Sequence, residues 1–264
     1  MEVLLLGTGG ADGWPSPWCR CEACEDSRSR GVYRSPTCAL IDGRLQLDVG
    51  PHLASQAGRV GQSLAGVRTI LVTHAHADHL DPQFIWHRVW AGTDPVVLAG
   101  PSPVMAVCHE WLAPEQTDIE LVEVSAGSEL RLDGYRVVAL PANHHAFGPV
   151  VLYAIEGPDG SRILYATDTG RWVDAAADLL SGWRFDVVLM EETFGDRTDL
   201  GEEHLGFDSF AEEVARLREL GCVDDATRVV AVHLSHHNPP EAEVRARLGE
   251  IGVELLPEGT RIVV

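Results

Sequence analysis

Lysine is absent from this sequence: its 20 basic residues are all arginine, set against 40 aspartates and glutamates. The formal net charge is -20. A surface this acidic repels phosphate backbones and anionic lipid headgroups, so we expect neither nucleic acid nor a membrane among the partners. A small anionic substrate is still compatible with this charge, because bound metal ions reverse the sign of the field inside a pocket.

Long apolar runs are also missing. No window approaches the roughly 18 apolar residues of a membrane-spanning helix, and the opening MEVLLLGTGG lacks the basic stretch of a secretion signal. We therefore expect a cytoplasmic protein. Core-forming residues are plentiful, since 45% of the 264 residues are hydrophobic. Because no linker interrupts the chain, we expect one domain over residues 1–264.

Cysteines are few, and half of them are clustered. Cys19, Cys21 and Cys24 lie within six residues, in a Trp/Pro-rich loop at about residues 14–30. Without a secretion signal, such a cluster is more typical of metal binding than of a disulfide framework. Three thiolates can hold one zinc ion, but a closed tetrahedral site needs a fourth ligand. Reduced cysteines in a loop are the alternative interpretation.

Short apolar runs alternate with helical stretches along the chain. We expect strands at residues 2–6, 37–41, 44–48, 69–73, 96–99, 119–124, 135–141, 150–155, 163–167, 187–190, 229–232 and 261–264. We expect helices at residues 102–111, 173–180, 207–220 and 240–251, the third of them capped by Asp208. Hairpins early in the chain and helices between later strands predict an α/β sandwich of mixed sheets covered by helices.

Histidines are concentrated where one of these strands ends. The segment 70–79 is an apolar strand that runs into His74, His76, Asp78 and His79. Imidazole nitrogens and carboxylate oxygens are the usual ligands of Zn, Mn or Fe. His74 and His76 can hold one ion, and Asp78 and His79 can reach a second. A solvated histidine-rich loop is the alternative.

Further candidate ligands follow other apolar strands. They are His144 and His145 after residues 137–143, Asp168 after 163–167, and His233, His236 and His237 after 229–232. One polar residue after a strand is usually a turn or a cap. Four strands that each end in metal-type ligands indicate convergence on one edge of the sandwich.

The run His74-x-His76-x-Asp78-His79, followed by His144, Asp168 and His233, resembles the binuclear metallo-β-lactamase superfamily. The resemblance implies a four-layer αββα fold. It assigns His74, His76 and His144 to a first metal and Asp78, His79 and His233 to a second, with Asp168 bridging. Asn143-His144 matches the strand-end position of the family better than His145 does. Asp48 resembles the aspartate that orients the histidine loop, although it is equally typical of a strand-end cap.

The cysteine loop narrows the resemblance. It is similar to a loop in the PhnP-like phosphodiesterases of phosphonate degradation and in the PqqB proteins of PQQ biosynthesis. The resemblance to the phosphodiesterases implies that the fourth zinc ligand is a histidine three residues after the last ligand of the catalytic metals. Here that residue is His236, with His237 as the competing choice. One short segment would then join two catalytic metals (Zn, Mn or Fe) to a structural zinc.

The resemblance predicts a hydrolase. Two metals can activate one water and neutralise charge on a phosphoryl or carbonyl oxygen. His204 matches a non-ligand histidine of the superfamily's phosphodiesterases, so we assign it as general acid or phosphate-binding group; an exposed histidine at a helix entry is the alternative. Asp78 and Asp168 complete the catalytic set.

The leading hypothesis is a phosphodiesterase for a small, for example cyclic, diester. Hydrolysis of a lactone, lactam or thioester is the second hypothesis, and a non-catalytic accessory protein similar to PqqB is the third. A tRNA-processing nuclease fits poorly with the net charge of -20. The superfamily often forms dimers, so a homodimer is compatible with the resemblance.

Overall fold

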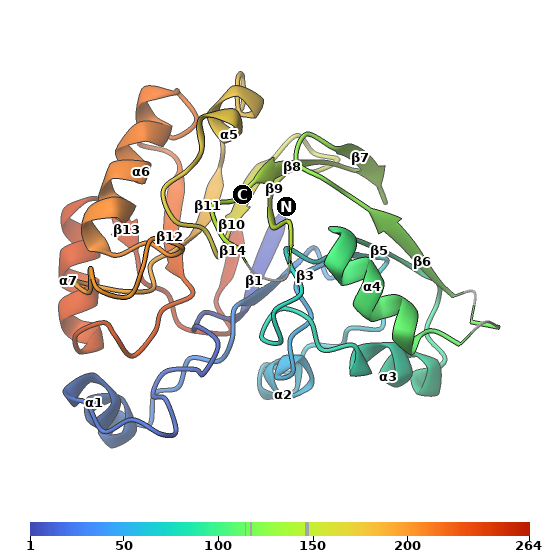
Figure 1. Cartoon of the computed structure of the whole chain (residues 1–264), viewed down its shortest axis with the longest axis horizontal. Helices are drawn as coiled ribbons and strands as arrows, with labels where there is room; N and C mark the ends of the chain where they lie inside the picture. Colours follow the sequence, from blue (N-terminus) through green and yellow to red (C-terminus); the bar gives the residue numbers. More distant parts are fainter. Residues whose placement is uncertain (114, 117, 146–147) are drawn as a thin grey trace.

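Two seven-stranded sheets pack face to face in the computed structural model, which describes residues 1–113, 115–116, 118–145 and 148–264 (Figure 1). The first sheet has the order β14 (Arg261–Val263), β1 (Glu2–Gly7), β2 (Cys38–Ile41), β3 (Leu45–Leu47), β4 (Thr69–Leu71), β5 (Val96–Gly100) and β6 (Ile119–Glu123). The second has the order β13 (Val253–Glu254), β12 (Arg228–Val232), β11 (Val187–Glu191), β10 (Arg162–Ala166), β9 (Val151–Glu156), β8 (Tyr135–Pro141) and β7 (Glu129–Leu132).

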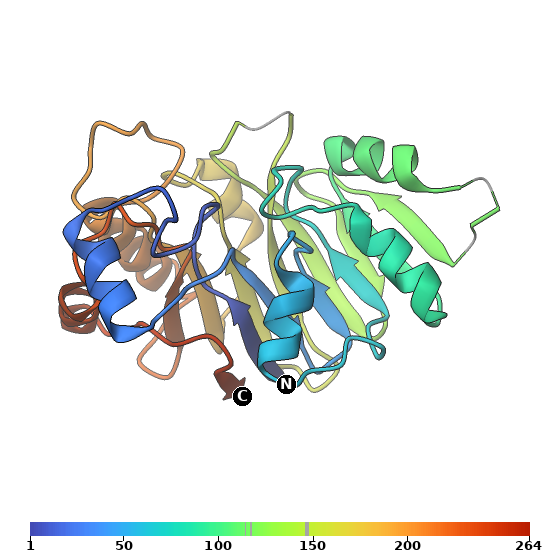
Figure 2. The same ribbon diagram turned by 90° about the horizontal axis from the view of Figure 1, so that it is seen from below.

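Helices cover the outer face of each sheet (Figures 1 and 2). The first sheet carries α2 (Leu53–Arg59), α3 (Gln83–Ala91) and α4 (Ser102–Trp111). The second carries α5 (Asp174–Leu179), α6 (Phe207–Glu219) and α7 (Glu241–Glu250). The remaining helix, α1 (Glu22–Arg30), lies in the N-terminal loop. The expected four-layer αββα sandwich is confirmed.

The apolar residues form three layers of core. Between the sheets, buried side chains from both inner faces meet, among them Leu5 and Leu71 from one sheet and Tyr153 and Leu189 from the other. A second layer joins the second sheet to α5, α6 and α7, and a third joins the first sheet to α2, α3 and α4. Each sheet is therefore buried on both faces, which explains why its central strands have continuous apolar runs.

Parallel pairing sets where the polar loops gather. Strands β3 to β6 are mutually parallel, and so are β10 to β13. The carboxyl ends of parallel strands lie at one edge of a sheet, and in open α/β sheets ligands bind at that edge. The loops that follow β3, β4, β10 and β12 carry most of the histidines and aspartates singled out in the sequence, and His144 follows the antiparallel strand β8.

Several elements differ from the sequence-based expectations. The prediction of Asp208 as the cap of α6 is wrong: Gly206 is the N-cap, its N–H donates to Ser209 Oγ at 3.0 Å, and Asp208 lies in the first turn. Helices α1, α2 and α3 and strands β7 and β13 were not predicted. No helix in the described part of the chain is both long and apolar enough to cross a membrane.

Candidate metal centre

The loop after β4 brings two sets of candidate ligands together. In the first set, the ligand atoms of His74, His76, His144 and Asp168 all lie within 4.8 Å of one another. His74 Nε2 is 3.1 Å from Asp168 Oδ2, and His76 Nδ1 is 3.0 Å from His74 Nε2 and 3.3 Å from His144 Nε2. Three ring nitrogens and one carboxylate oxygen therefore face a common point.

The second set comprises Asp78, His79, Asp168 and His233, again with ligand atoms within 4.8 Å. His79 Nε2 is 3.0 Å from Asp78 Oδ2 and 3.1 Å from Asp168 Oδ2. His233 Nε2 lies 3.0 Å from the other oxygen, Asp168 Oδ1. Asp168 thus belongs to both sets. All four residues are buried.

The charges of this cluster are strongly perturbed. Burial lowers the pKa of His74 to about 4, so its ring is neutral and can act as a ligand. Burial disfavours the charged form of Asp168, but the imidazoles of His233 and His79 hold its pKa well below the usual value. Burial opposes protonation of His233 as well, yet Asp168 raises its pKa to about 10. A metal cation bound in this cluster would take the place of the proton that His233 otherwise holds.

A buried nitrogen without a hydrogen bond tests whether the cluster fits metals. His79 Nε2 makes no hydrogen bond within the described part of the chain, although two carboxylate oxygens lie close to it. An unpaired polar atom at this depth is costly unless something else binds it. The donor set of imidazoles and carboxylates suits two divalent cations, so the residues present fit the group that the sequence predicts.

Asp48, just after β3, contacts the loop that follows β4 and holds it in place. Its carboxylate accepts hydrogen bonds from the Thr73 backbone N–H at 2.8 Å and from the Tyr165 hydroxyl at 2.9 Å. It also lies 2.7 Å from His79 Nδ1. A donor at Nδ1 leaves Nε2 as the nitrogen that can bind a metal, so Asp48 fixes both the tautomer and the direction of His79. The structure therefore favours the orienting role over a simple strand-end cap.

His144 and His145 lie in different environments. His144 is 5% exposed, and its Nδ1 lies 3.1 Å from the backbone carbonyl oxygen of Glu203, which leaves Nε2 directed at the first ligand set. The side chain of His145 is 78% exposed and pairs with Glu203 at the surface. Of the two histidines, His144 is therefore the one whose ring lies with the first ligand set.

His204 lies beside the ligands, and its supporting carboxylate was missed from the sequence. Its Nδ1 is 3.0 Å from both carboxylate oxygens of Glu191, which is fully buried at the end of β11. Burial opposes protonation, but Glu191 raises the pKa of His204 above its usual value. Glu191 also accepts from Thr193 Oγ1, which contacts His233 Nδ1 at 3.0 Å. Glu191 is the last residue of the apolar strand β11, so a search that included the final residue of each strand would have found it.

Three residues of this centre have left-handed backbone conformations. Asp48, Asp168 and His233 have φ angles of 56°, 55° and 56°. Such values are uncommon for residues other than glycine and are typical of functional sites whose surroundings hold them in place. Asp48 and His233 lie immediately after β3 and β12, and Asp168 lies two residues after the last residue of β10.

The cysteine cluster forms a separate candidate metal site with His236, which lies on the same chain segment as His233. The ligand atoms of Cys19, Cys21, Cys24 and His236 all lie within 4.8 Å of one another. Cys24 is completely buried, and burial raises its pKa to about 12. His236 Nε2 is also 3.5 Å from Asp12 Oδ2, and the His237 ring packs on that of His236. The geometry favours His236 over His237 as the fourth ligand.

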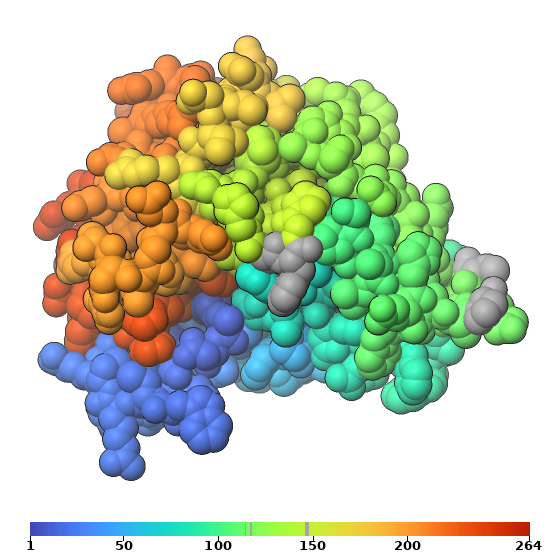
Figure 3. Space-filling model, in the orientation of Figure 1, coloured from blue at the N-terminus to red at the C-terminus, as the bar shows by residue number. Residues whose placement is uncertain are grey.

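The N-terminal loop reaches this position by packing against the C-terminal part of the chain. Figure 3 shows the blue N-terminal loop in contact with the orange and red C-terminal segments. Gly9 and Leu234 form a parallel bridge, and Cys21 Sγ contacts the His236 carbonyl oxygen at 3.5 Å. The two candidate sites are therefore connected by the two residues between His233 and His236.

Comparisons with known proteins agree with this architecture. A ribonuclease Z from Mycobacterium tuberculosis (strain ATCC 25177 / H37Ra) is 27% identical over 185 residues, covering 64% of this chain and 62% of that protein. The chain thus spans less than two thirds of that relative. A solved diphosphatase of the PhnP family has a TM-score of 0.76 at 22% identity, covering 99% of this chain and 96% of that one.

A second solved structure, zinc-bound PqqB from Methylobacterium extorquens, has a TM-score of 0.78 at 19% identity and covers 100% of both chains. At these identities the two structures establish a shared fold. The family model of the beta-lactamase superfamily domain matches residues 40–234, which include every residue of the two His/Asp ligand sets. The chain belongs to the beta-lactamase superfamily.

Proposed function

We propose that this protein is a binuclear metal-dependent hydrolase that acts on a small phosphodiester. The observation that carries the proposal is the junction of two largely buried ligand sets at Asp168, with His204 and Glu191 directly beside them. When bound, two divalent metals would supply a water of lowered pKa and neutralise negative charge on the substrate. His74, His76, His144 and Asp168 would hold one, and Asp78, His79, Asp168 and His233 the other.

The residues beside the ligands suit a substrate whose leaving group needs a proton, as that of an alkyl phosphodiester does. A leaving alkoxide needs a proton, whereas neighbouring metals do not supply one. Because Nδ1 of His204 is engaged by Glu191, its Nε2 is the nitrogen that can hold this proton. The raised pKa of His204 keeps the donor form populated. Shared ligand Asp168 would fix the separation of the two metals, and Asp48 the direction of His79.

The names of similar proteins support chemistry at phosphorus. One is called a ribonuclease and another a diphosphatase. The net charge of -20 favours a small molecule over an RNA, because each phosphate of a polyanion would be repelled by the surface. We therefore extend from these relatives only the class of bond cleaved and propose a small, for example cyclic, diester as the substrate.

A substrate screen tests this proposal. The Zn- and Mn-loaded proteins should be assayed on bis(4-nitrophenyl) phosphate, a cyclic phosphodiester, 4-nitrophenyl phosphate, a lactone, a thioester, a β-lactam and a precursor tRNA. We expect the highest kcat/KM on a small diester and loss of that activity in His74→Ala. His109→Ala is the matched control, because His109 is exposed on α4 and distant from the ligands in sequence and in contacts.

Other outcomes of the screen identify the alternatives. A higher kcat/KM on the lactone, thioester or lactam would replace the diester by a carboxyl derivative. Cleavage of the precursor tRNA above all small substrates would contradict the expected exclusion of nucleic acid. No hydrolysis by protein with a full complement of metal would favour an accessory role.

A further inference from the structure

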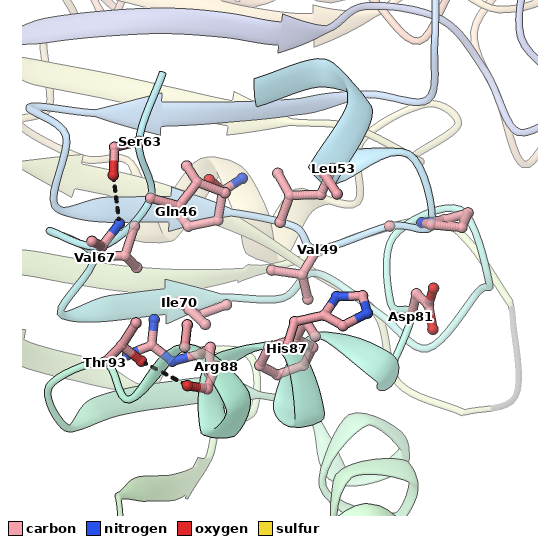
Figure 4. A pocket seen from close by; sticks show the side chains of 17 residues that line it. Gln46, Val49, Leu53, Ser63, Val67, Ile70, Asp81, His87, Arg88 and Thr93 are labelled. Atoms are coloured by element: carbon pink, nitrogen blue, oxygen red, sulfur yellow. Dashed lines mark hydrogen bonds between the residues drawn. The ribbon is translucent and has the colours of Figure 1, made fainter. Parts of the chain in front are cut away.

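Two cavities of similar size differ in what surrounds them. One has a volume of about 340 Å³ and lies between α2 and α3, with walls that are mainly apolar (Figure 4). Among the described residues that line it there is no candidate metal ligand. The other has a volume of about 430 Å³ and is lined by His204, so we name it the His204 cavity. Of the two, the His204 cavity is the one that adjoins the proposed reaction centre.

Four segments form the wall of the His204 cavity. Asn143 and Arg171 come from the loops after β8 and β10, and several residues between 194 and 206 come from the loop after β11. The start of α6 completes the wall with Asp208 and Glu212. Because the loops after β8 and β10 also carry candidate metal ligands, the cavity lies beside the metal centre.

His204 is the residue that the cavity shares with the surroundings of the metal ligands. Its ring centroid is 4.8 Å from that of His144 and 5.3 Å from that of His233. Nδ1 is engaged by Glu191, whereas Nε2 makes no hydrogen bond within the described part of the chain and is not buried. A leaving alcohol that takes a proton from Nε2 is therefore expected to lie in the His204 cavity.

Both arginines of this wall are already paired with carboxylates. Arg171 pairs with Glu212 from α6. Arg197 pairs with Asp199 through contacts of 2.7 Å and 2.8 Å. An anionic group in the cavity would have to displace one of these carboxylates before it could bind an arginine. The arginines therefore do not form a ready site for an anion.

Two carboxylates of the wall, Glu202 and Asp208, have no cationic partner. Both are exposed, and neither forms an ion pair within the described part of the chain. His204 and its carboxylate partner add no net charge, and Asp196 is paired with Arg247 at 2.6 Å. The N-terminus of α6 contributes a partial charge of about +0.5, which two carboxylates exceed. The side of the cavity away from the metal ligands therefore has a negative potential.

Phe194 adds an aromatic ring to the same wall. Its centroid is 5.1 Å from that of His204, with the planes inclined by 72°, and the residue is partly buried. An ammonium group is attracted both by carboxylates and by the face of an aromatic ring. The wall therefore suits a small cation better than a neutral or an anionic group of the same size.

We propose that the His204 cavity binds the leaving alcohol of the substrate and selects an amino alcohol, which carries an ammonium group. The inference rests on the proposed phosphodiesterase function and narrows its substrate class. When water attacks phosphorus, the P–O bond to the amino alcohol breaks, the alcohol oxygen keeps the electron pair, and His204 Nε2 supplies its proton. Glu202 and Asp208 set the specificity, because their charges favour the cation and repel an anionic leaving group.

Two phosphonates of the same shape test the preference for positive charge. 2-(Trimethylammonio)ethylphosphonate carries the cation, and 3,3-dimethylbutylphosphonate has carbon in place of its nitrogen. Water does not cleave their P–C bond under assay conditions, so calorimetry with the metal-loaded protein measures binding alone. We expect the ammonium compound to bind about tenfold more tightly at low salt, and less so at high salt. Equal Kd values, or no saturable binding by either compound, would overturn the inference.

Charge-removing variants test which side chains select the cation. Glu202→Gln and Asp208→Asn each keep the size of the side chain, and each should lower the ratio of the two Kd values about threefold. Glu219→Gln is the matched control, because Glu219 is exposed at the other end of α6 and does not line the cavity. An unchanged ratio in the double variant Glu202→Gln, Asp208→Asn would overturn the assigned specificity.

Hydrolysis of bis(4-nitrophenyl) phosphate separates this inference from the proposed function, because neither alcohol of that diester has an ammonium group. Equal phosphonate affinities in a protein that hydrolyses this diester would overturn the inference and leave the hydrolase in place. A protein that prefers the ammonium compound but hydrolyses no diester would support the cation-selective cavity and contradict the proposed function.

Discussion

The imidazole of His204 is stacked on that of His233, with ring centroids 5.3 Å apart and planes inclined by 9°. The two rings are linked underneath by Glu191 and Thr193, which contact His204 Nδ1 and His233 Nδ1 respectively. His204 is thus held at a fixed distance from His233, a candidate metal ligand, but it belongs to neither of the two ligand sets that share Asp168. This arrangement suits a group that transfers a proton to substrate at the edge of the centre.

His204→Ala should therefore slow hydrolysis according to the leaving group. For alkyl diesters, whose alkoxide must be protonated, we expect kcat to fall by about 10²–10⁴-fold. For 4-nitrophenyl diesters the loss should be much smaller, because nitrophenolate leaves without help. His145→Ala is the control, because His145 is next to the ligands in sequence but its side chain is exposed. Equal losses on both substrates would exclude the acid role.

Asp48→Asn tests the support of His79. The amide keeps the size of the carboxylate but removes its charge and can present an N–H to His79 Nδ1, which favours the wrong tautomer. We expect metal affinity at the second ligand set to fall about 10–100-fold, measured by competition with a fluorescent chelator. Asp81→Asn changes the same residue type just outside the loop and should bind metal normally. Unchanged affinity in Asp48→Asn would mean that His79 is oriented by packing alone.

Metal content separates the two kinds of site. We expect about three metal ions per wild-type chain by elemental analysis, two from the His/Asp sets and one from the cysteine cluster. The double variant Asp78→Ala, His79→Ala should retain a zinc ion, because the thiolate site does not use these side chains. One ion per wild-type chain would favour the accessory role over the hydrolase.

Cys24→Ala should remove the zinc ion that the double variant retains. Since a structural metal contributes its binding free energy to folding, the midpoint of thermal unfolding should also fall. Cys108→Ala is the matched control, because Cys108 is equally buried but isolated on α4. The zinc content of this control should not change. A Cys24→Ala variant that keeps all its zinc would show that the cluster is not a metal site.

Glu192 gives a prediction for the dependence of stability on pH. Burial raises its pKa from 4.5 to about 8, and its Oε2 has no partner in the described part of the chain. The stability that the neutral carboxyl contributes is complete below pH 4.5 and is lost as the pH rises through about 8. At about 1.4 kcal/mol per pKa unit, the loss amounts to a few kcal/mol.

Glu192→Gln should remove this loss, because the amide is neutral at every pH. Urea unfolding at pH 6 and pH 9 should show a smaller decrease in the free energy of unfolding for the variant than for the wild type. Glu250→Gln, at an exposed position of α7, should follow the wild type. Parallel pH curves for Glu192→Gln and the wild type would contradict a raised pKa at this position.

Much of the centre follows from the sequence because its ligands obey one rule. His74, Asp168 and His233 come directly after short apolar runs, and parallel strands bring such positions to one edge. Glu191 falls outside this rule, because it is the last residue of β11 itself and is followed by a second glutamate. Its contact with His204 Nδ1, which no sequence pattern shows, marks it as part of the centre.

The elements that sequence reasoning missed share a weak periodic signal. Helix α1 has the sequence EACEDSRSR, in which Ala23 and Cys24 are the apolar residues, so no amphipathic stripe is visible. Strand β7 alternates exposed and half-buried residues at the edge of its sheet.

The positive φ angles of Asp48, Asp168 and His233 restrict which amino acids these positions can use. Among residues with a side chain beyond hydrogen, asparagine, aspartate and histidine tolerate this conformation best. Glutamate and cysteine also bind divalent metals, but they lack that tolerance. Backbone shape and coordination chemistry therefore act as two independent filters on Asp168 and His233, and both residues pass both, whereas Asp48 has to combine the backbone shape with its contact to His79. An engineered replacement of these positions has to meet the conformational requirement before any question of affinity arises.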